Sequence, residues 1–172
     1  MTEILHRARC IRLAAFDVDG VLTEGRLQFS GAGEDTKVFD TLDGHGLKEL
    51  AAAGVELAII SGRGSPALER RAANLGITRL HQGVSDKAAV FEHMLATMGI
   101  GATEVAFMGD DLPDIPVLKR CGLAITVPSA PLAVRLASHL VTRRAGGRGA
   151  VREACDLILL ARSAATTPDI AA

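Results

Sequence analysis

Four short apolar runs, three of them followed directly by a small or polar residue, constrain the fold of this chain more than any other feature. They cover residues 11–16, 55–60, 105–108 and 123–127, and segments with helical spacing separate them. Near-continuous apolar strands that alternate with helices are typical of a parallel sheet with helices on both faces. The sequence therefore predicts an α/β fold.

The remaining segments predict one domain with an added hairpin. Helical spacing recurs near residues 44–53, 65–75, 87–98, 112–120, 130–137 and 149–161. Residues 27–39 break the alternation, and the Gly-containing turn at 30–33 predicts a β-hairpin there. We expect a single domain over residues 1–162 and a mobile tail over residues 163–172, which are small and polar.

Composition excludes several classes of protein. The 172 residues carry a formal net charge of −1, which argues against nucleic acid as a partner, since phosphate backbones recruit strongly basic surfaces. No apolar run approaches the roughly 18 residues of a membrane helix, so no membrane partner is expected. Residues 1–12 lack a secretory pattern, and the three cysteines show no zinc or redox spacing. These features favour a cytoplasmic protein.

Chemically useful side chains follow three of the predicted strands. Asp17, Ser61 and Asp110 come at or just after the ends of apolar runs. In open α/β sheets, ligands bind at the carboxyl ends of the strands, so one site can hold all three residues despite their separation in sequence. Ser61 and the backbone amides after it suit phosphate oxygens, although an N-cap role for Ser61 is an alternative.

The charges around these residues indicate a phosphate and a metal ion. Lys87 opens a predicted helix, where the helix dipole disfavours a cation, and a role in holding a phosphoryl group would explain its place. Asp110, Asp111 and Asp114 put three acids within five residues. They repel one another unless a cation lies among them, and hard oxygen ligands at this charge density favour Mg²⁺.

Taken in order, these motifs resemble a known superfamily. Asp17-x-Asp19-Gly20, Ser61-Gly62-Arg63, Lys87 and Gly109-Asp110-Asp111-x-x-Asp114 are similar to the four motifs of the haloacid dehalogenase superfamily. Receiver domains use similar residues, but there the acidic pair comes first and here it comes last. The resemblance implies a Rossmann-like haloacid dehalogenase core, with a parallel sheet flanked by helices, a β-hairpin and no cap domain.

Further stretches resemble one family within it, the 3-deoxy-D-manno-octulosonate 8-phosphate phosphatases. They are residues 17–23, Phe39-x-x-x-Asp43-Gly44-x-Gly46, 75–77, 82–83 and 145–153 (AGGRGAVRE). The resemblance implies a phosphoric monoester hydrolase that acts in lipopolysaccharide biosynthesis. Alternatives are a phosphatase for a nine-carbon keto-sugar-acid phosphate and a non-catalytic oligomerisation module. Arg63 favours the octulosonate enzyme over the nine-carbon one, in which this position is acidic.

The resemblance also implies a role for each motif residue. Asp17 would be the nucleophile that forms an aspartyl-phosphate. Asp19 would be the general acid and base, and neighbouring acids would favour its protonated form. Ser61 and Lys87 would hold phosphoryl oxygens. Mg²⁺ would be bound by the carboxylates of Asp17 and Asp110 and the backbone carbonyl of Asp19. Asp111 and Asp114 would orient the metal's waters or Lys87.

Substrate binding and assembly are implied in the same way. The expected contacts are Asp19, Asp40, Thr41, Leu42, Asp43, Gly44, Lys48, Gly62, Arg63, Arg71, Lys87 and Arg148. Two positions depart from the family, in which Asp or Asn is frequent at Glu24 and Arg is common at Leu42. The spacing between motifs leaves no room for a cap domain, so the resemblance implies a tetramer in which one subunit covers the next one's site. Arg148 lies among glycines and is expected on a mobile loop that closes over the substrate.

Overall fold

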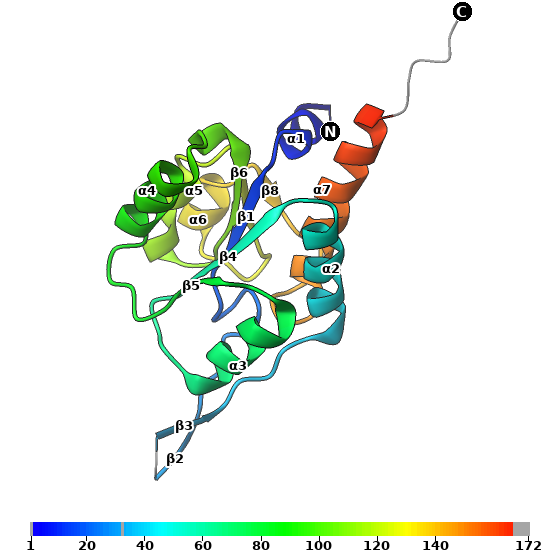
Figure 1. The fold of residues 1–172 in the computed structure, drawn as a ribbon. Helices are drawn as coiled ribbons and strands as arrows, with labels where there is room; N and C mark the ends of the chain where they lie inside the picture. Colours follow the sequence, from blue (N-terminus) through cyan, green and yellow to red (C-terminus); the bar gives the residue numbers. More distant parts are fainter. Residues whose placement is uncertain (1, 32, 167–172) are drawn as a thin grey trace, which may run out of the picture.

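The computed structural model describes residues 2–31 and 33–166 and has a six-stranded parallel sheet at its centre (Figure 1). The sheet order is β5-β4-β1-β6-β7-β8. Its strands are β1 (Leu13–Phe16), β4 (Glu56–Ile60), β5 (Arg79–His81), β6 (Val105–Met108), β7 (Leu123–Thr126) and β8 (Leu140–Val141). This is the Rossmann-like α/β architecture that the sequence predicts.

The helices cover both faces of the sheet. They are α1 (Thr2–Arg9), α2 (Thr41–Ala52), α3 (Pro66–Leu75), α4 (Lys87–Met98), α5 (Ile115–Leu118), α6 (Leu132–Leu136) and α7 (Ala150–Thr166), with 3₁₀ turns η1 (Ala102–Glu104) and η2 (Leu112–Asp114). Helices α2 and α7 lie together on one side, and α4, α5 and α6 lie on the other (Figure 1). Every residue of β1, β6 and β7 is therefore buried, as a doubly covered parallel sheet requires.

Local sequence signals set the ends of the helices. Ser65 caps α3 by accepting a hydrogen bond from the Leu68 amide, and Gly76 ends the helix in a left-handed conformation. Asp86 caps α4 in the same way. Lys87 is thereby the first residue of α4, which fixes its position at the carboxyl edge of the sheet.

The predicted hairpin is present but shorter than expected. Strands β2 (Gln28–Ser30) and β3 (Gly33–Thr36) pair antiparallel and extend away from the main sheet (Figure 1). Phe39 lies beyond the hairpin and is half-buried, with the Arg71 guanidinium 5.5 Å from its ring centroid. The exposed apolar residues of the hairpin region are Leu27, Phe29 and Val38.

Several elements differ from the sequence-based expectation. The sequence does not predict helix α1 or the edge strands β5 and β8. The two strands are short and lack a buried apolar run, and α1 buries only Ala8. The expected tail starts too early, since α7 continues to Thr166, and residues 167–172 lie outside the described part. Within the described ranges, no insertion large enough for a cap interrupts the core, and no helix is long and apolar enough to span a bilayer.

Candidate active site

The carboxyl ends of three neighbouring strands bring the predicted motifs together. Strand β1 lies between β4 and β6, and its last residue, Phe16, pairs with Ile59 and Met108. The motifs that follow these strands therefore meet at one edge of the sheet. A cleft of about 410 Å³ there is lined by members of all four motifs: Asp17, Asp19, Ser61, Gly62, Arg63, Lys87, Asp110, Asp111 and Asp114.

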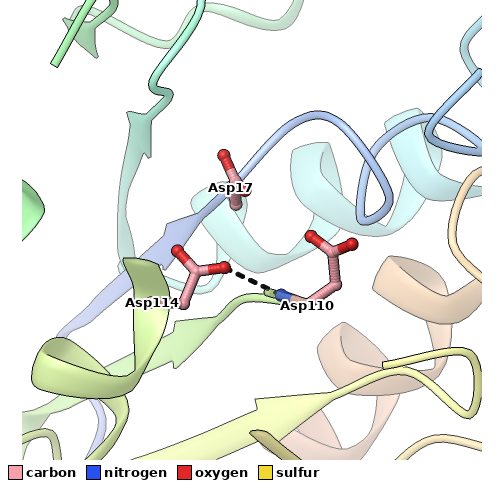
Figure 2. A group of neighbouring side chains, drawn as sticks. All are labelled: Asp17, Asp110 and Asp114. Carbon is pink, nitrogen blue, oxygen red and sulfur yellow. Dashed lines mark hydrogen bonds between the residues drawn. The ribbon is translucent and has the colours of Figure 1, made fainter. Parts of the chain in front are cut away.

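Three carboxylates form the centre of this cleft. Figure 2 shows Asp17 at the end of β1, with Asp110 and Asp114 beside it. One oxygen from each residue lies within 4.8 Å of the others. Asp114 is completely buried, and its Oδ2 accepts hydrogen bonds from the backbone amides of Asp110 (2.9 Å) and Asp111 (3.1 Å). The Asp114 carboxylate therefore organises the loop that carries Asp110.

Lys87 connects two of these acids. Its Nζ lies 2.9 Å from Asp17 Oδ2 and 2.7 Å from Asp114 Oδ1. Burial opposes the charged form of Lys87, but the attraction of Asp17 and Asp114 outweighs this effect and raises the lysine pKa. Lys87 is thus a fixed cation beside the proposed nucleophile, and Asp114 is the residue that positions it.

The surroundings of Asp17 and Asp110 favour the binding of a proton or a metal ion to their carboxylates. Burial, followed by repulsion from Asp114, raises the pKa of Asp17 to about 6, although Lys87 partly offsets the shift. Burial and repulsion from the neighbouring acids, Asp17 first, raise the pKa of Asp110 to about 7. Both carboxylates therefore lack sufficient positive charge around them.

A divalent cation fits this arrangement at Asp17 and Asp110. Oδ1 of Asp110 is buried and has no hydrogen-bond partner among the described residues. A Cβ atom on Gly20 would lie only 2.0 Å from Oδ2 of Asp110. The carboxylate of Asp110 therefore packs directly against the backbone of the loop after β1. Both oxygens of Asp114 are already used, and Asp114 is therefore not counted as a ligand although it belongs to the cluster.

Ser61 offers a hydroxyl in the same cleft. It is buried at the end of β4, and its Oγ accepts a hydrogen bond from the Arg63 amide (3.3 Å). The alternative N-cap role is wrong, because Ser65 caps the next helix. The Ser61 hydroxyl proton is therefore able to point to an oxygen in the cleft.

Comparisons with known proteins agree with this geometry. Residues 27–122 match the model of the haloacid dehalogenase-like hydrolases. The chain is 46% identical over 160 residues to the 3-deoxy-D-manno-octulosonate 8-phosphate phosphatase KdsC of Yersinia pestis, covering 93% of this chain and 86% of the relative. The KdsC of Escherichia coli K12 is 45% identical over 161 residues, covering 93% and 85%.

This chain belongs to the 3-deoxy-D-manno-octulosonate 8-phosphate phosphatase family of haloacid dehalogenase-like hydrolases. Solved structures of the family superpose closely. That of the Yersinia pestis phosphatase has a TM-score of 0.91 at 45% identity, over 94% of this chain and 87% of the other. The Moraxella catarrhalis phosphatase, solved with magnesium, phosphate and KDO, has a TM-score of 0.93 at 42% identity, over 95% and 94%.

Several expected substrate contacts of this phosphatase-family chain lie outside its own cleft. They are Asp40, Thr41, Leu42, Asp43, Gly44, Lys48, Arg71 and Arg148. Asp40 caps α2, and its backbone carbonyl accepts a hydrogen bond from Arg71. Leu42 and Lys48 are exposed on α2, and Arg148 forms an exposed ion pair with Glu24 at 2.9 Å.

Asp43 and Gly44 have structural roles that explain their identities. The side chain of Asp43 is buried and accepts hydrogen bonds from the backbone amides of Gly149 (3.4 Å) and Arg152 (2.8 Å). Gly44 is buried, and a Cβ there would lie 2.3 Å from Nη2 of Arg71. Both oxygens of Asp43 therefore accept backbone amides at or just before the start of α7, and a direct substrate contact from this side chain stays a prediction.

The glycine-rich stretch of residues 145–149 packs against the loop after β1, which carries Asp17 and Asp19. The Gly147 amide donates to the Val21 carbonyl at 2.9 Å. A Cβ on Gly146 would lie 1.7 Å from the Gly20 oxygen, so the two backbones are in direct contact. This packing holds the backbone of Gly146 and Gly147 in place, and the closing movement expected for the loop stays a prediction.

One residue of the cleft region had no signal in the sequence analysis. Lys37 follows β3, and its Nζ lies 2.5 Å from Oδ1 of Asp19. Arg63 is the second cation near Asp19, with Nε at 3.8 Å from Oδ2. Asp19 therefore faces two cations as well as the acids that line the same cleft. This pairing depends on the segment after β3 returning beside the loop after β1, which the sequence does not indicate.

Proposed function

We propose that this protein hydrolyses 3-deoxy-D-manno-octulosonate 8-phosphate to the free sugar acid and phosphate, as a Mg²⁺-dependent phosphatase in lipopolysaccharide biosynthesis. The observation that carries the proposal is the cleft, where an acidic pair for a metal lies beside a fixed lysine and a buried serine hydroxyl. Relatives at 45–46% identity have this activity in their names. The Moraxella catarrhalis relative, at 42% identity, was solved in complex with magnesium, phosphate and KDO.

In the first chemical step, Asp17 is the nucleophile. An oxygen of Asp17 attacks phosphorus and forms an aspartyl-phosphate, while the bond between phosphorus and the sugar oxygen breaks. Asp19 gives its proton to that oxygen. Lys87 and the Ser61 hydroxyl hold the other phosphoryl oxygens, so that the phosphorus faces Asp17.

The second step regenerates the enzyme. Asp19 takes a proton from a water molecule, which attacks the aspartyl-phosphate and releases phosphate. Asp17 and Asp110, with the backbone carbonyl of Asp19, would hold Mg²⁺, which supplies positive charge to the phosphoryl group. Asp114 positions Lys87, and Oδ1 of Asp111 accepts a hydrogen bond from the Leu112 amide at the start of η2.

We further propose that neighbouring subunits complete the site of a tetramer. The cleft has no cap, while Phe29 and Val38 expose 62% and 71% of their surface on or beside the hairpin. An isolated two-stranded hairpin is marginally stable, and contact with another copy would bury these side chains. Asp40, Thr41, Leu42, Lys48, Arg71 and Arg148, which lie outside their own cleft, would then reach a neighbour's substrate.

Phe29→Asp tests this assembly. The variant should dissociate on gel filtration and lose kcat/KM for the sugar-acid phosphate, with a much smaller loss for an aryl phosphate. The exposed apolar residue Leu160, on α7, provides the matched control Leu160→Asp. A dissociated Phe29→Asp protein with undiminished activity on the sugar-acid phosphate would refute a shared site.

A cytoplasmic location is also proposed. Cys10, Cys121 and Cys155 are all free thiols, and the last two are buried. Free buried thiols are typical of proteins in reducing compartments.

Phosphate release from a panel of sugar phosphates tests the function, with Mg²⁺ and with chelator. We expect the octulosonate 8-phosphate to be preferred over nine-carbon keto-sugar-acid phosphates, and chelator to remove activity. Absence of Mg²⁺-dependent phosphate release from every substrate would favour the non-catalytic module instead.

A further inference from the structure

The hairpin supplies a buried lysine to the proposed acid–base residue. The side chain of Lys37 is 3% exposed, and its Nζ lies 2.5 Å from Oδ1 of Asp19, whose side chain is 20% exposed. An ammonium group is buried in proteins only when it is paired, because desolvation otherwise costs too much. The pair with Asp19 is therefore a fixed feature of the cleft.

The two oxygens of Asp19 have different surroundings. Lys37 donates to Oδ1, whereas Oδ2 is buried and has no hydrogen-bond partner among the described residues. The nearby Arg63 guanidinium lies 3.8 Å from Oδ2, beyond hydrogen-bond distance. Lys37 thus restrains one oxygen of Asp19 and leaves the other without a donor, which is the arrangement that a proton-transfer group needs.

We propose that Lys37 is a positioning residue for the acid–base step of Asp19, a role that rests on the phosphatase function proposed above. When Asp17 attacks, the bond from phosphorus to the leaving oxygen breaks, and its electron pair stays on that oxygen. The bond between Asp19 and its proton breaks, and the proton goes to the leaving oxygen. Lys37 compensates the negative charge that Asp19 acquires and keeps its carboxylate in place.

The return step uses the same contact in the opposite direction. Asp19 accepts a proton from the attacking water and becomes neutral, and Lys37 then donates to the neutral carboxyl. Because Lys37 lies on the returning arm of the hairpin, the placement of the hairpin sets the charge beside Asp19. This contact connects the hairpin to the chemistry of its own subunit.

The dependence of the rate on the leaving group tests this role. An alkyl oxygen, as in the sugar-acid 8-phosphate, needs a proton to leave, whereas 4-nitrophenolate leaves without one. The kcat/KM value reports only steps up to formation of the aspartyl-phosphate. Lys37→Met should lower kcat/KM for the sugar-acid phosphate roughly 10- to 100-fold, and for 4-nitrophenyl phosphate by less than about 3-fold.

Controls separate positioning from folding. Asp19→Asn should give the same split between substrates, and adding Lys37→Met to it should cause little further loss, since the two residues act as one unit. Lys37→Arg should recover part of the activity, and Lys119→Met, at an exposed lysine, should match the wild type.

An equal loss on both substrates would assign Lys37 a merely structural role and overturn the inference. Undiminished activity of Lys37→Met on the sugar-acid phosphate would overturn it as well. A wild-type protein that hydrolyses neither substrate would refute the phosphatase function itself, and that outcome is distinct from both.

Discussion

Gly146→Ala should damage the active site without touching any residue that lines the cleft. A Cβ at this position would lie 1.7 Å from the Gly20 oxygen and 2.5 Å from the Gly20 carbonyl carbon. Real Cβ atoms keep at least 3.0 Å from such neighbours, so the two backbones must separate by about 1.3 Å. Gly146 does not have a positive φ, and the cost therefore comes from lack of space alone.

Neither backbone can move without affecting the chemistry. The stretch of residues 145–149 is held by the bonds from Asp43 to the start of α7, and Gly20 lies directly after Asp19 with Asp110 resting on it. Overpacking of this kind costs about 1–3 kcal/mol, which lowers the melting temperature of a protein of this size by roughly 2–12 °C. A displacement near 1 Å at a reacting group lowers kcat on the order of 100-fold.

Thermal denaturation and steady-state kinetics on the purified variant check both numbers. Gly101→Ala is the matched control, because Gly101 has a φ of −83° and a Cβ there would meet nothing closer than 3.5 Å. A Gly146→Ala protein as stable and active as this control would show that the close backbone contact is not required.

Three further predictions follow from the site. Asp17→Asn should fold normally but lose multiple turnover, because an amide cannot form the acyl phosphate; measurable turnover by the pure variant in a phosphate-release assay would refute the assignment. Because burial raises the pKa values of Asp17 and Asp110 to about 6 and 7 in the metal-free protein, the folded state keeps protons that the unfolded state has lost. Its free energy of unfolding should therefore fall as the pH rises from about 4 to about 7, and calorimetry should show Mg²⁺ binding more tightly as protons leave; a pH-independent affinity would contradict this. Asp43→Asn should keep kcat/KM within about 3-fold, whereas Asp43→Ala should cost about 1–2 kcal/mol in chemical denaturation by removing the acceptor for the amides of Gly149 and Arg152; a large loss of activity in the Asn variant would indicate that the Asp43 side chain contacts substrate.

Local sequence patterns predict much of the fold. The central strands β1, β4, β6 and β7 are nearly continuous apolar runs, and the caps Ser65 and Asp86 mark where helices begin. Edge strands β5 and β8 and the helix α1 were missed because a short, half-buried element needs no apolar run. Their pairing depends on neighbours that are distant in the sequence.

The sequence by itself determined the order of the strands' motifs and the convergence of Asp17, Ser61 and Asp110, because parallel strands must end at a common edge. Only the tertiary structure decided which charged groups pair and which backbone segments pack against each other. In the folded protein, Lys37 pairs with Asp19, the carboxylate of Asp43 accepts a hydrogen bond from the first turn of α7, and Gly146 packs against Gly20. These contacts join segments whose separation in sequence carries no periodic or spacing signal, and burial determines which polar groups must find each other.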